Sequence, residues 1–179
     1  NGQFRPFALK WYKGQVFVGA VCDASGGSGT KSNLRAYVFR LNPTTGVWTT
    51  LFDFPLTYPK GFPTADDRTA TGWFPWTDDF SDFIIAASSG NRDDVVYPQP
   101  ILTDLEIDVD GTLVLGFGDR GAMQTGYRNF HPGGDNGRLY TGYVGGDVLR
   151  AFHNGTGRYV LENASKAGPN LGYDPDNNQ

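Results

Sequence analysis

Three side chains in the second half of the sequence have the chemistry needed for acid–base catalysis. Asp119 and Arg120 follow directly after an apolar run, and His131 comes next in a loop rich in Gly and Asp. A carboxylate, a guanidinium and an imidazole that meet in a fold can transfer a proton and stabilise negative charge. A carboxylate beside an arginine at a strand end is more often a structural ion pair. These three residues are therefore the catalytic candidates, although the sequence favours a structural role for the first two.

A second group of residues has the chemistry of recognition rather than catalysis. Trp73, Phe74, Trp76 and Phe80 lie in one short segment, next to an acidic pair at residues 78–79. Exposed aromatic side chains are enriched where proteins bind partners. The segment therefore predicts a binding platform for carbohydrate or for a protein. The alternative is that it folds back and covers the face of a sheet.

Oxygen-bearing side chains near the C-terminal end have the spacing of a hard-cation site. Asp174, Asp176 and Asn178 alternate along the chain, and carboxylate and amide oxygens are the ligands that calcium prefers. Calcium is thus the one cofactor that the sequence suggests.

Two Asn-X-Ser/Thr sequons begin at Asn154 and Asn163. Such sequons accept N-glycans in a eukaryotic secreted protein and are ordinary turn residues in a bacterial one.

Composition excludes several classes of function. The net charge is −4 and the pI is about 5.0, with no cluster of Lys and Arg, so a nucleic-acid surface is not expected. No stretch approaches the roughly 18 uncharged apolar residues of a membrane span. Cys22 is the only cysteine, and its apolar surroundings in sequence predict a buried structural thiol.

The elements that must position these residues are short strands arranged in two similar sets. The first set covers residues 6–11, 15–22, 34–41 and 47–52, and the second covers residues 101–108, 112–117, 147–152 and 158–161. Lys13-Gly14 and Asp110-Gly111 separate the first two runs of each set, and Gly accepts the positive φ of a tight hairpin. The pattern predicts an all-β fold of two four-stranded antiparallel meanders, the unit from which β-propeller blades are built.

Two such units are too few to close a propeller, which uses about four to eight blades. We therefore expect a partial propeller of about two blades plus long loops. Its divisions are a first unit at residues 1–53, an aromatic and acidic connecting segment at 54–100, a second unit at 101–162 and a polar tail at 163–179. Open sheet edges present unpaired backbone groups. Other copies, or remaining segments of the same protein, are the expected partners that complete the sheets.

The sequence also resembles known propeller families. The run from Leu102 to Asp119, with its Asp-Gly turn between apolar strands, resembles the blade pattern of NHL- and gluconolactonase-like propellers. The chain from Arg5 to Asn170 resembles propeller-like regions of large bacterial surface proteins that carry SdrD B-like repeats. This resemblance implies a secreted or cell-surface location.

Together these observations predict an extracellular structural or adhesive module that acts through assembly or ligand binding. One alternative is part of a metal-dependent, lactonase-like propeller hydrolase that uses Asp119, Arg120 and His131. Another is a carbohydrate-binding module built on the aromatic segment. The sequence favours binding or assembly over catalysis.

Overall fold

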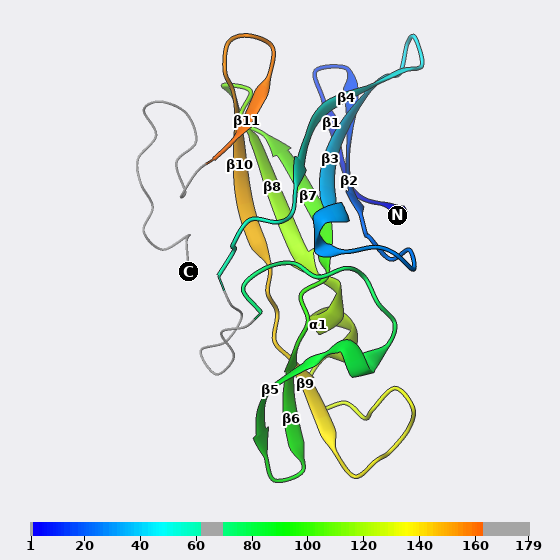
Figure 1. Ribbon diagram of the computed structural model, residues 1–179. Coiled ribbons are helices and arrows are strands. Elements are labelled where there is room, and N and C mark those ends of the chain that lie inside the picture. Colours follow the sequence, from blue (N-terminus) through cyan, green and yellow to red (C-terminus); the bar gives the residue numbers. More distant parts are fainter. Residues whose placement is uncertain (1, 62–69, 163–179) are drawn as a thin grey trace.

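The computed structural model describes residues 2–61 and 70–162, where nearly all regular structure is β-strand (Figure 1). Sheet 1 has the order β1 (Phe4–Tyr12), β2 (Gln15–Cys22), β3 (Arg35–Asn42) and β4 (Val47–Pro55). Sheet 2 has the order β7 (Pro100–Ile107), β8 (Leu113–Asp119), β10 (Asp147–His153) and β11 (Tyr159–Leu161). Both sheets are antiparallel. The all-β prediction is confirmed, but none of the described sheets is closed.

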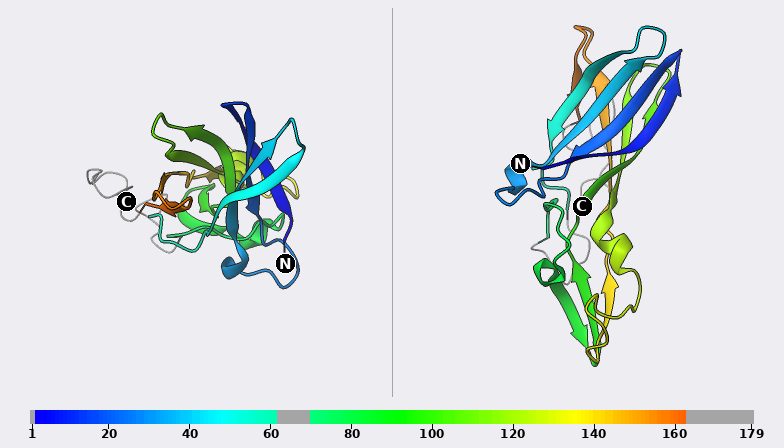
Figure 2. Two further views of the ribbon diagram at one scale, coloured as in Figure 1. Left: turned by 90° about the horizontal axis from the view of Figure 1, so that it is seen from above. Right: turned by 90° about the vertical axis from the view of Figure 1, so that its right-hand side faces the viewer.

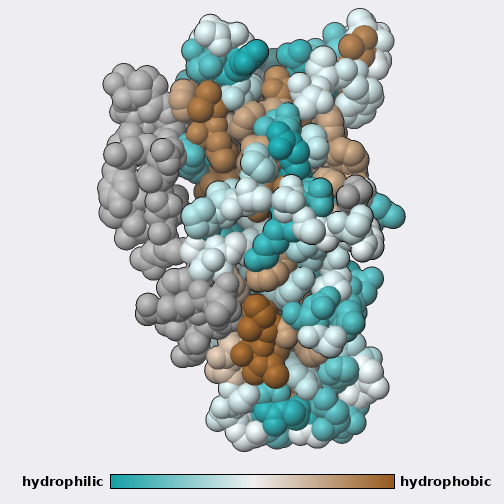
Figure 3. Space-filling model, viewed as in Figure 1, coloured by the Kyte–Doolittle hydropathy of each residue, from teal (hydrophilic) through white to brown (hydrophobic). Residues whose placement is uncertain are grey.

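A third sheet, which the sequence pattern did not predict, lies at the other end of the molecule (Figure 1). It consists of β5 (Ile84–Ser89), β6 (Arg92–Val96) and β9 (Leu139–Gly142). Ile85 of β5 is exposed, and Figure 3 shows apolar residues at the surface over this part of the molecule. β5 pairs with β6 through an antiparallel hairpin, whereas β9 returns from a distant part of the chain to pair with β6 in parallel. The one α-helix of the described residues, α1 (Arg120–Thr125), packs on β9.

Turn chemistry explains why the two four-stranded sheets form where the sequence predicts them. Lys13 and Gly14 both have positive φ, 46° and 75°, which is the backbone form of a tight hairpin turn. Gly111 has a φ of 88° in the corresponding turn of sheet 2. Since each turn holds only a few residues, the strands on either side must pair with each other. These turns account for the β1–β2 and β7–β8 pairs, whereas the β2–β3 and β8–β10 pairs join strands that are separated by longer connections.

The main core lies between sheets 1 and 2, whose inner faces pack against each other. β1 and β2 both contact β7, and an ion pair from Lys10 to Glu106 links the two sheets at this edge. Inner-face side chains from both sheets are buried, including Phe17, Val21, Val38, Phe54, Leu102, Leu105, Leu113, Leu115 and Phe117. Burial of this apolar surface is the main favourable contribution to folding.

Gly19 of β2 allows the closest approach between the two sheets. A Cβ placed on Gly19 would lie 2.5 Å from Cδ2 of Leu102 and 2.9 Å from Cβ of Ala8. Leu102 is fully buried, so its side chain has no room to withdraw. The missing side chain at Gly19 is therefore what lets β7 pack onto the middle of sheet 1.

None of the helices in the described residues has the length and hydropathy of a membrane span. The only α-helix there is six residues long.

We predict that Gly19→Ala lowers the free energy of unfolding by about 1–3 kcal/mol, because the added methyl overpacks the interface with Leu102. The matched control is Gly27→Ala, since a Cβ at Gly27 would meet no atom within 4 Å. Urea denaturation of both variants measures the effect. Equal stability of the two variants would contradict the close approach.

Candidate functional site

Asp119, the first catalytic candidate, lies at a junction of three backbone segments. It is the last residue of β8 and the N-cap of α1, and its side chain is fully buried. Its carboxylate accepts hydrogen bonds from the backbone N–H groups of Gln99 at 3.0 Å, Gly145 at 3.1 Å and Ala122 at 3.3 Å. Burial raises the pKa of Asp119, and these hydrogen bonds oppose that rise. The Asp119 side chain therefore links these three backbone segments through hydrogen bonds.

Arg120 turns away from Asp119 and joins the aromatic segment. Its Nη1 donates to the carbonyl of Thr77 at 3.0 Å and to Oε1 of Gln99 at 2.6 Å, and its Nη2 forms an ion pair with Asp78. Arg120 thus pairs with Asp78 and not with its neighbour in sequence. His131 accepts a hydrogen bond from the backbone of Gly133. In the described contacts, His131 forms no hydrogen bond or ion pair with Asp119 or Arg120.

The four aromatic residues of the predicted platform are divided between the core and the surface. Trp73 is buried in the main core, and its indole Nε1 donates to the hydroxyl of Tyr58 at 3.1 Å. Phe74 packs against Tyr97 in a tilted arrangement with a centroid distance of 4.5 Å, and Lys31 Nζ lies 3.5 Å from the Phe74 ring centroid. These two residues therefore support the fold of the segment.

Trp76 and Phe80 are half-buried and each lines a pocket. Trp76 contacts two guanidinium groups, from Arg5 at 5.0 Å and from Arg120 at 4.8 Å, measured from Cζ to the ring centroid. Phe80 stacks on Phe83 with centroids 4.9 Å apart. The structure thus does not gather the four predicted residues on one exposed surface.

The two pockets lie next to each other. The arginine pocket has a volume of about 450 Å³ and is lined by Arg5, Ser25, Trp76 and Arg120 together with Thr77 and Asp78. The aromatic pocket has a volume of about 410 Å³ and is lined by three phenylalanine rings, from Phe80, Phe83 and Phe130, among other residues. Thr77 and Asp78 line both pockets, so the aromatic segment forms the wall between them.

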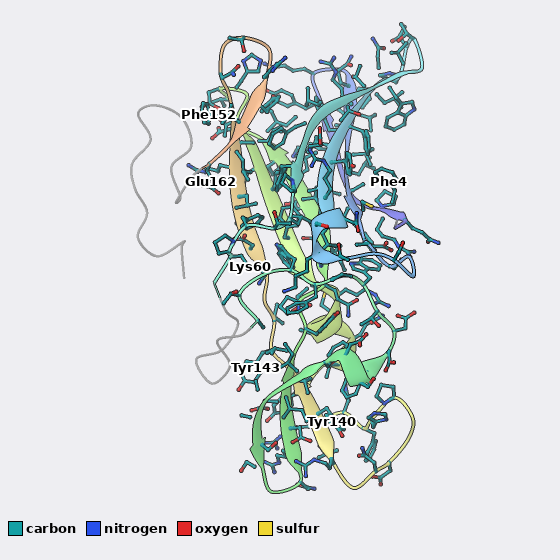
Figure 4. The ribbon with its side chains drawn as sticks, in the orientation of Figure 1. Phe4, Lys60, Tyr140, Tyr143, Phe152 and Glu162 are labelled. Carbon is teal, nitrogen blue, oxygen red and sulfur yellow. The ribbon has the colours of Figure 1, made fainter. Side chains whose placement is uncertain are left out.

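A partly buried polar cluster, which sequence reasoning missed, lies at mid-height of the molecule, where Figure 4 labels Lys60. Lys60 Nζ donates to the carbonyl of Gly145 at 2.6 Å and lies 4.4 Å from the ring centroid of Trp73. The hydroxyl of Tyr58 donates to Oδ2 of Asp147 at 2.8 Å. Burial lowers the pKa of Lys60 and raises those of Tyr58 and Asp147. No motif marks this cluster, because its members come from separate segments.

No other described element covers the outer face of sheet 1, as the right-hand view of Figure 2 shows. Two neighbouring rows of this face are mainly apolar. One cross-strand row contains Leu9, Val18 and Phe39, and a second row contains Trp11, Val16, Leu41 and Trp48. Leu9 is 70% exposed and Trp11 is 61% exposed. Phe4, also on this face, contacts Tyr37 with centroids 4.9 Å apart. We call this surface the apolar outer face.

The remaining predicted sites are only partly covered by the structure. Asp174, Asp176, Asn178 and Asn163 lie outside the described residues. Within the described ranges, no group of three or more His, Cys, Asp or Glu side chains is arranged to hold a metal ion. Asn154 lies exposed in the turn between β10 and β11, where its Oδ1 accepts a hydrogen bond from the Thr156 backbone.

The prediction that Cys22 is buried is wrong, since its side chain is half-buried at the end of β2. Cys22 pairs in register with Phe4 at the margin of the apolar outer face. The apolar run that contains it has one face in the core and the other toward the surface.

Comparison with known proteins finds similarity to two proteins of a eukaryote. The chain is 28% identical to Colossin-A of Dictyostelium discoideum over 120 residues, which are 65% of this chain and 1% of Colossin-A. It is 25% identical to Colossin-C of the same organism over 117 residues, which are 64% of this chain and 10% of Colossin-C. The chain thus spans a small part of the length of these relatives. No family model and no solved structure matches.

These findings correct the family resemblance drawn from the sequence. The matched proteins come from Dictyostelium and not from bacteria, and no family model supports an NHL- or gluconolactonase-like assignment. The Asp-Gly turn between apolar strands that suggested those families is a general feature of β-hairpins. It therefore identifies a type of local structure and not a family.

We predict that Asp147→Asn makes the stability of the protein less dependent on pH. Because burial raises the pKa of Asp147 in the folded state, its contribution to stability is fully present below about pH 4 and is lost as the pH rises through its folded pKa. The wild-type chain should therefore become more stable as the pH falls from 7 toward 4, and the variant should show a smaller rise in melting temperature. Asn keeps an acceptor for Tyr58.

Burial also raises the pKa values of Asp119 and Glu162, but both residues are present in wild type and variant, so the difference between the two proteins isolates Asp147. Two other buried carboxyls act in a different pH range. Hydrogen bonds from Arg138 lower the pKa of Asp93, and hydrogen bonds from Ser25, Gln3 and Arg5 lower that of Asp23 against the effect of burial. Their contributions are lost only below about pH 4. Parallel melting curves for wild type and variant between pH 4 and 7 would contradict the assignment.

Proposed function

We propose that this chain is a structural module that assembles through the apolar outer face of sheet 1. The partner that covers this face is a further β-sheet of the same polypeptide, packed as one propeller blade packs on the next. A secreted or cell-surface location belongs to the same proposal. The exposed position of Asn154 in a sequon is compatible with that location.

The observation that carries the proposal is the composition of the two faces of sheet 1. The inner face buries Ala8, Val38 and Phe17 against sheet 2. The two rows of the outer face named above repeat this character, with Thr50 as their one polar residue. The Arg35–Asp53 ion pair lies in the neighbouring rows of the same face. A sheet with one solvated face ordinarily alternates apolar and polar residues. Sheet 1 is therefore built as the middle layer of a stack.

Sheet 2 provides the internal comparison, because two rows of its outer face contain charged residues, although a further row at β11 is the apolar pair Phe152 and Val160. The row that contains Glu106, Val114 and Arg150 lies on this face, and so does the row that contains Asp104, Gly116 and Val148. Glu106, Arg150 and Asp104 are exposed. The two outer faces therefore differ in charge, since the charged side chains of these two rows of sheet 2 have no counterpart in the two rows of sheet 1 named above.

Two arguments favour a sheet of the same polypeptide as the occupant. The region that matches this chain is 1% of Colossin-A and 10% of Colossin-C, so in both relatives most of the chain lies outside it. Sheet-on-sheet packing also requires an apolar, twisted partner face, which another β-sheet supplies. Face-to-face packing of two four-stranded sheets is already present here between sheets 1 and 2.

Catalysis is not part of the proposal, because the candidate residues have structural partners. Asp119 accepts three backbone hydrogen bonds, and Arg120 is bound to Thr77, Gln99 and Asp78. The described geometry therefore supports assembly better than acid–base chemistry.

We expect the isolated chain to self-associate through the apolar outer face, and Leu9→Lys with Trp11→Lys to make it monomeric. Both side chains are exposed on the edge strand β1, so the double variant should keep its melting temperature within a few degrees. Light scattering coupled to gel filtration measures the mass, and binding of a dye for apolar surfaces measures the exposure. The matched control is Val148→Lys on the outer face of sheet 2, which should leave association unchanged.

Radical footprinting of Trp11 decides which molecule covers the face. In the full-length polypeptide that contains this module, Trp11 should be protected even when that polypeptide is monomeric, whereas the isolated chain, diluted until it is monomeric, should be labelled. Equal labelling in both would overturn the proposal. A discrete symmetric dimer of the isolated chain, formed through the same face and also present in the full-length protein, would assign the face to a second copy and overturn the choice of occupant.

A further inference from the structure

The aromatic pocket has the dimensions and lining of a small-molecule site. Its volume of about 410 Å³ falls within the range of roughly 300–1,000 Å³ that is typical of ligand pockets. It lies beside the aromatic segment and α1, away from the apolar outer face. Its use therefore does not depend on the assembly proposed above.

Three phenylalanine rings form its apolar wall. Phe80 and Phe83 are stacked on each other, and Phe80 is further held by Tyr140, which meets it edge to face with centroids 5.0 Å apart. Phe130, which is 61% exposed, also lines the pocket. The faces of aromatic rings carry partial negative charge and attract polarised C–H groups. A rigid pair of rings with a third exposed ring suits a flat ligand with C–H groups on one side.

The polar lining offers both donors and acceptors. The Gln124 amide has no hydrogen-bond partner among the described residues and can both donate and accept. The Asn129 side chain donates to the carbonyl of Thr125 at 2.6 Å, which leaves its oxygen as an acceptor. The hydroxyl of Thr77 accepts from the Asp79 backbone and keeps its own hydrogen to donate. This mixture complements hydroxyl groups, which donate and accept at the same atom.

The charged side chains at the pocket favour a neutral ligand over a cationic one. Asp78 is the only charged side chain that lines the pocket, and its carboxylate is already paired with Arg120. An organic cation would compete with that guanidinium for the same carboxylate. A neutral hydroxyl group can instead donate to the second oxygen of Asp78 while the ion pair stays intact.

From these observations we infer that the aromatic pocket binds a short neutral saccharide, with Phe130 and Phe80 against its C–H face and with Gln124, Asn129 and Asp78 bound to its hydroxyl groups. Trp73 and Trp76 take no part, because neither lines this pocket. The site thus differs from the platform that the sequence predicted and shares with it only Phe80.

The test uses saturation-transfer NMR of the chain with four neutral disaccharides, namely cellobiose, N,N′-diacetylchitobiose, lactose and mannobiose, followed by calorimetry on those that bind. At least one should bind, and Phe130→Ala should weaken it by about tenfold or more, which corresponds to about 1.4 kcal/mol. Gln124→Ala should weaken it by a smaller factor. Both side chains are on the surface, so these variants should fold.

The matched control is Tyr127→Ala, because Tyr127 is an aromatic residue near the pocket that is 66% exposed and does not line it. This variant should bind like the wild type. Failure of all four disaccharides to bind would overturn the inference, and so would binding that Phe130→Ala leaves unchanged. Tetramethylammonium is the competing probe. If it binds in a manner abolished by Asp78→Asn while the disaccharides do not, the pocket is a cation site.

Discussion

The buried carboxylate of Asp119 is the interaction on which the arrangement of the three sheets depends. A carboxylate withdrawn from water is costly unless hydrogen bonds replace its hydration. Here the donors are backbone groups at the entry to β7, at the start of α1 and just before β10. One side chain therefore fixes three chain segments where sheet 2 ends and the path to the third sheet begins. Arg120, the next residue, extends this junction to Thr77, so the walls of both pockets are set by the same contact region.

Local chemistry explains how much of the fold could be predicted from the sequence. The hairpin turns at Lys13-Gly14 and Asp110-Gly111 force neighbouring strands to pair, so the first hairpin of each sheet follows from short-range patterns. The third sheet could not be found in this way. β9 pairs with β6 from a distant part of the chain, and its four residues have no alternation strong enough to mark a strand. A parallel partner also needs no turn between the strands.

Residue type alone could not settle which functional residues are buried. Trp73 and Trp76 are three positions apart, yet one is in the core and the other lines a pocket. The sequence placed both in one aromatic platform, because propensity does not tell which face of a loop meets a sheet. Lys60 is a residue that the sequence did not mark as part of any site. A single lysine in a loop is normally solvated, and only the fold brings it against Trp73 and Gly145.

The unequal outer faces of sheets 1 and 2 give any array of such sheets a direction. Layers can be added beyond sheet 1, where the surface is apolar, but the charged rows with Glu106, Arg150 and Asp104 oppose a further dry layer on sheet 2. Repeat architectures close their ends with units whose outward surface is polar. Sheet 2 has that character, so a linear array would stop at this module. A closed ring of sheets needs an apolar surface on both faces of every layer, so the charged rows of sheet 2 would interrupt such a ring.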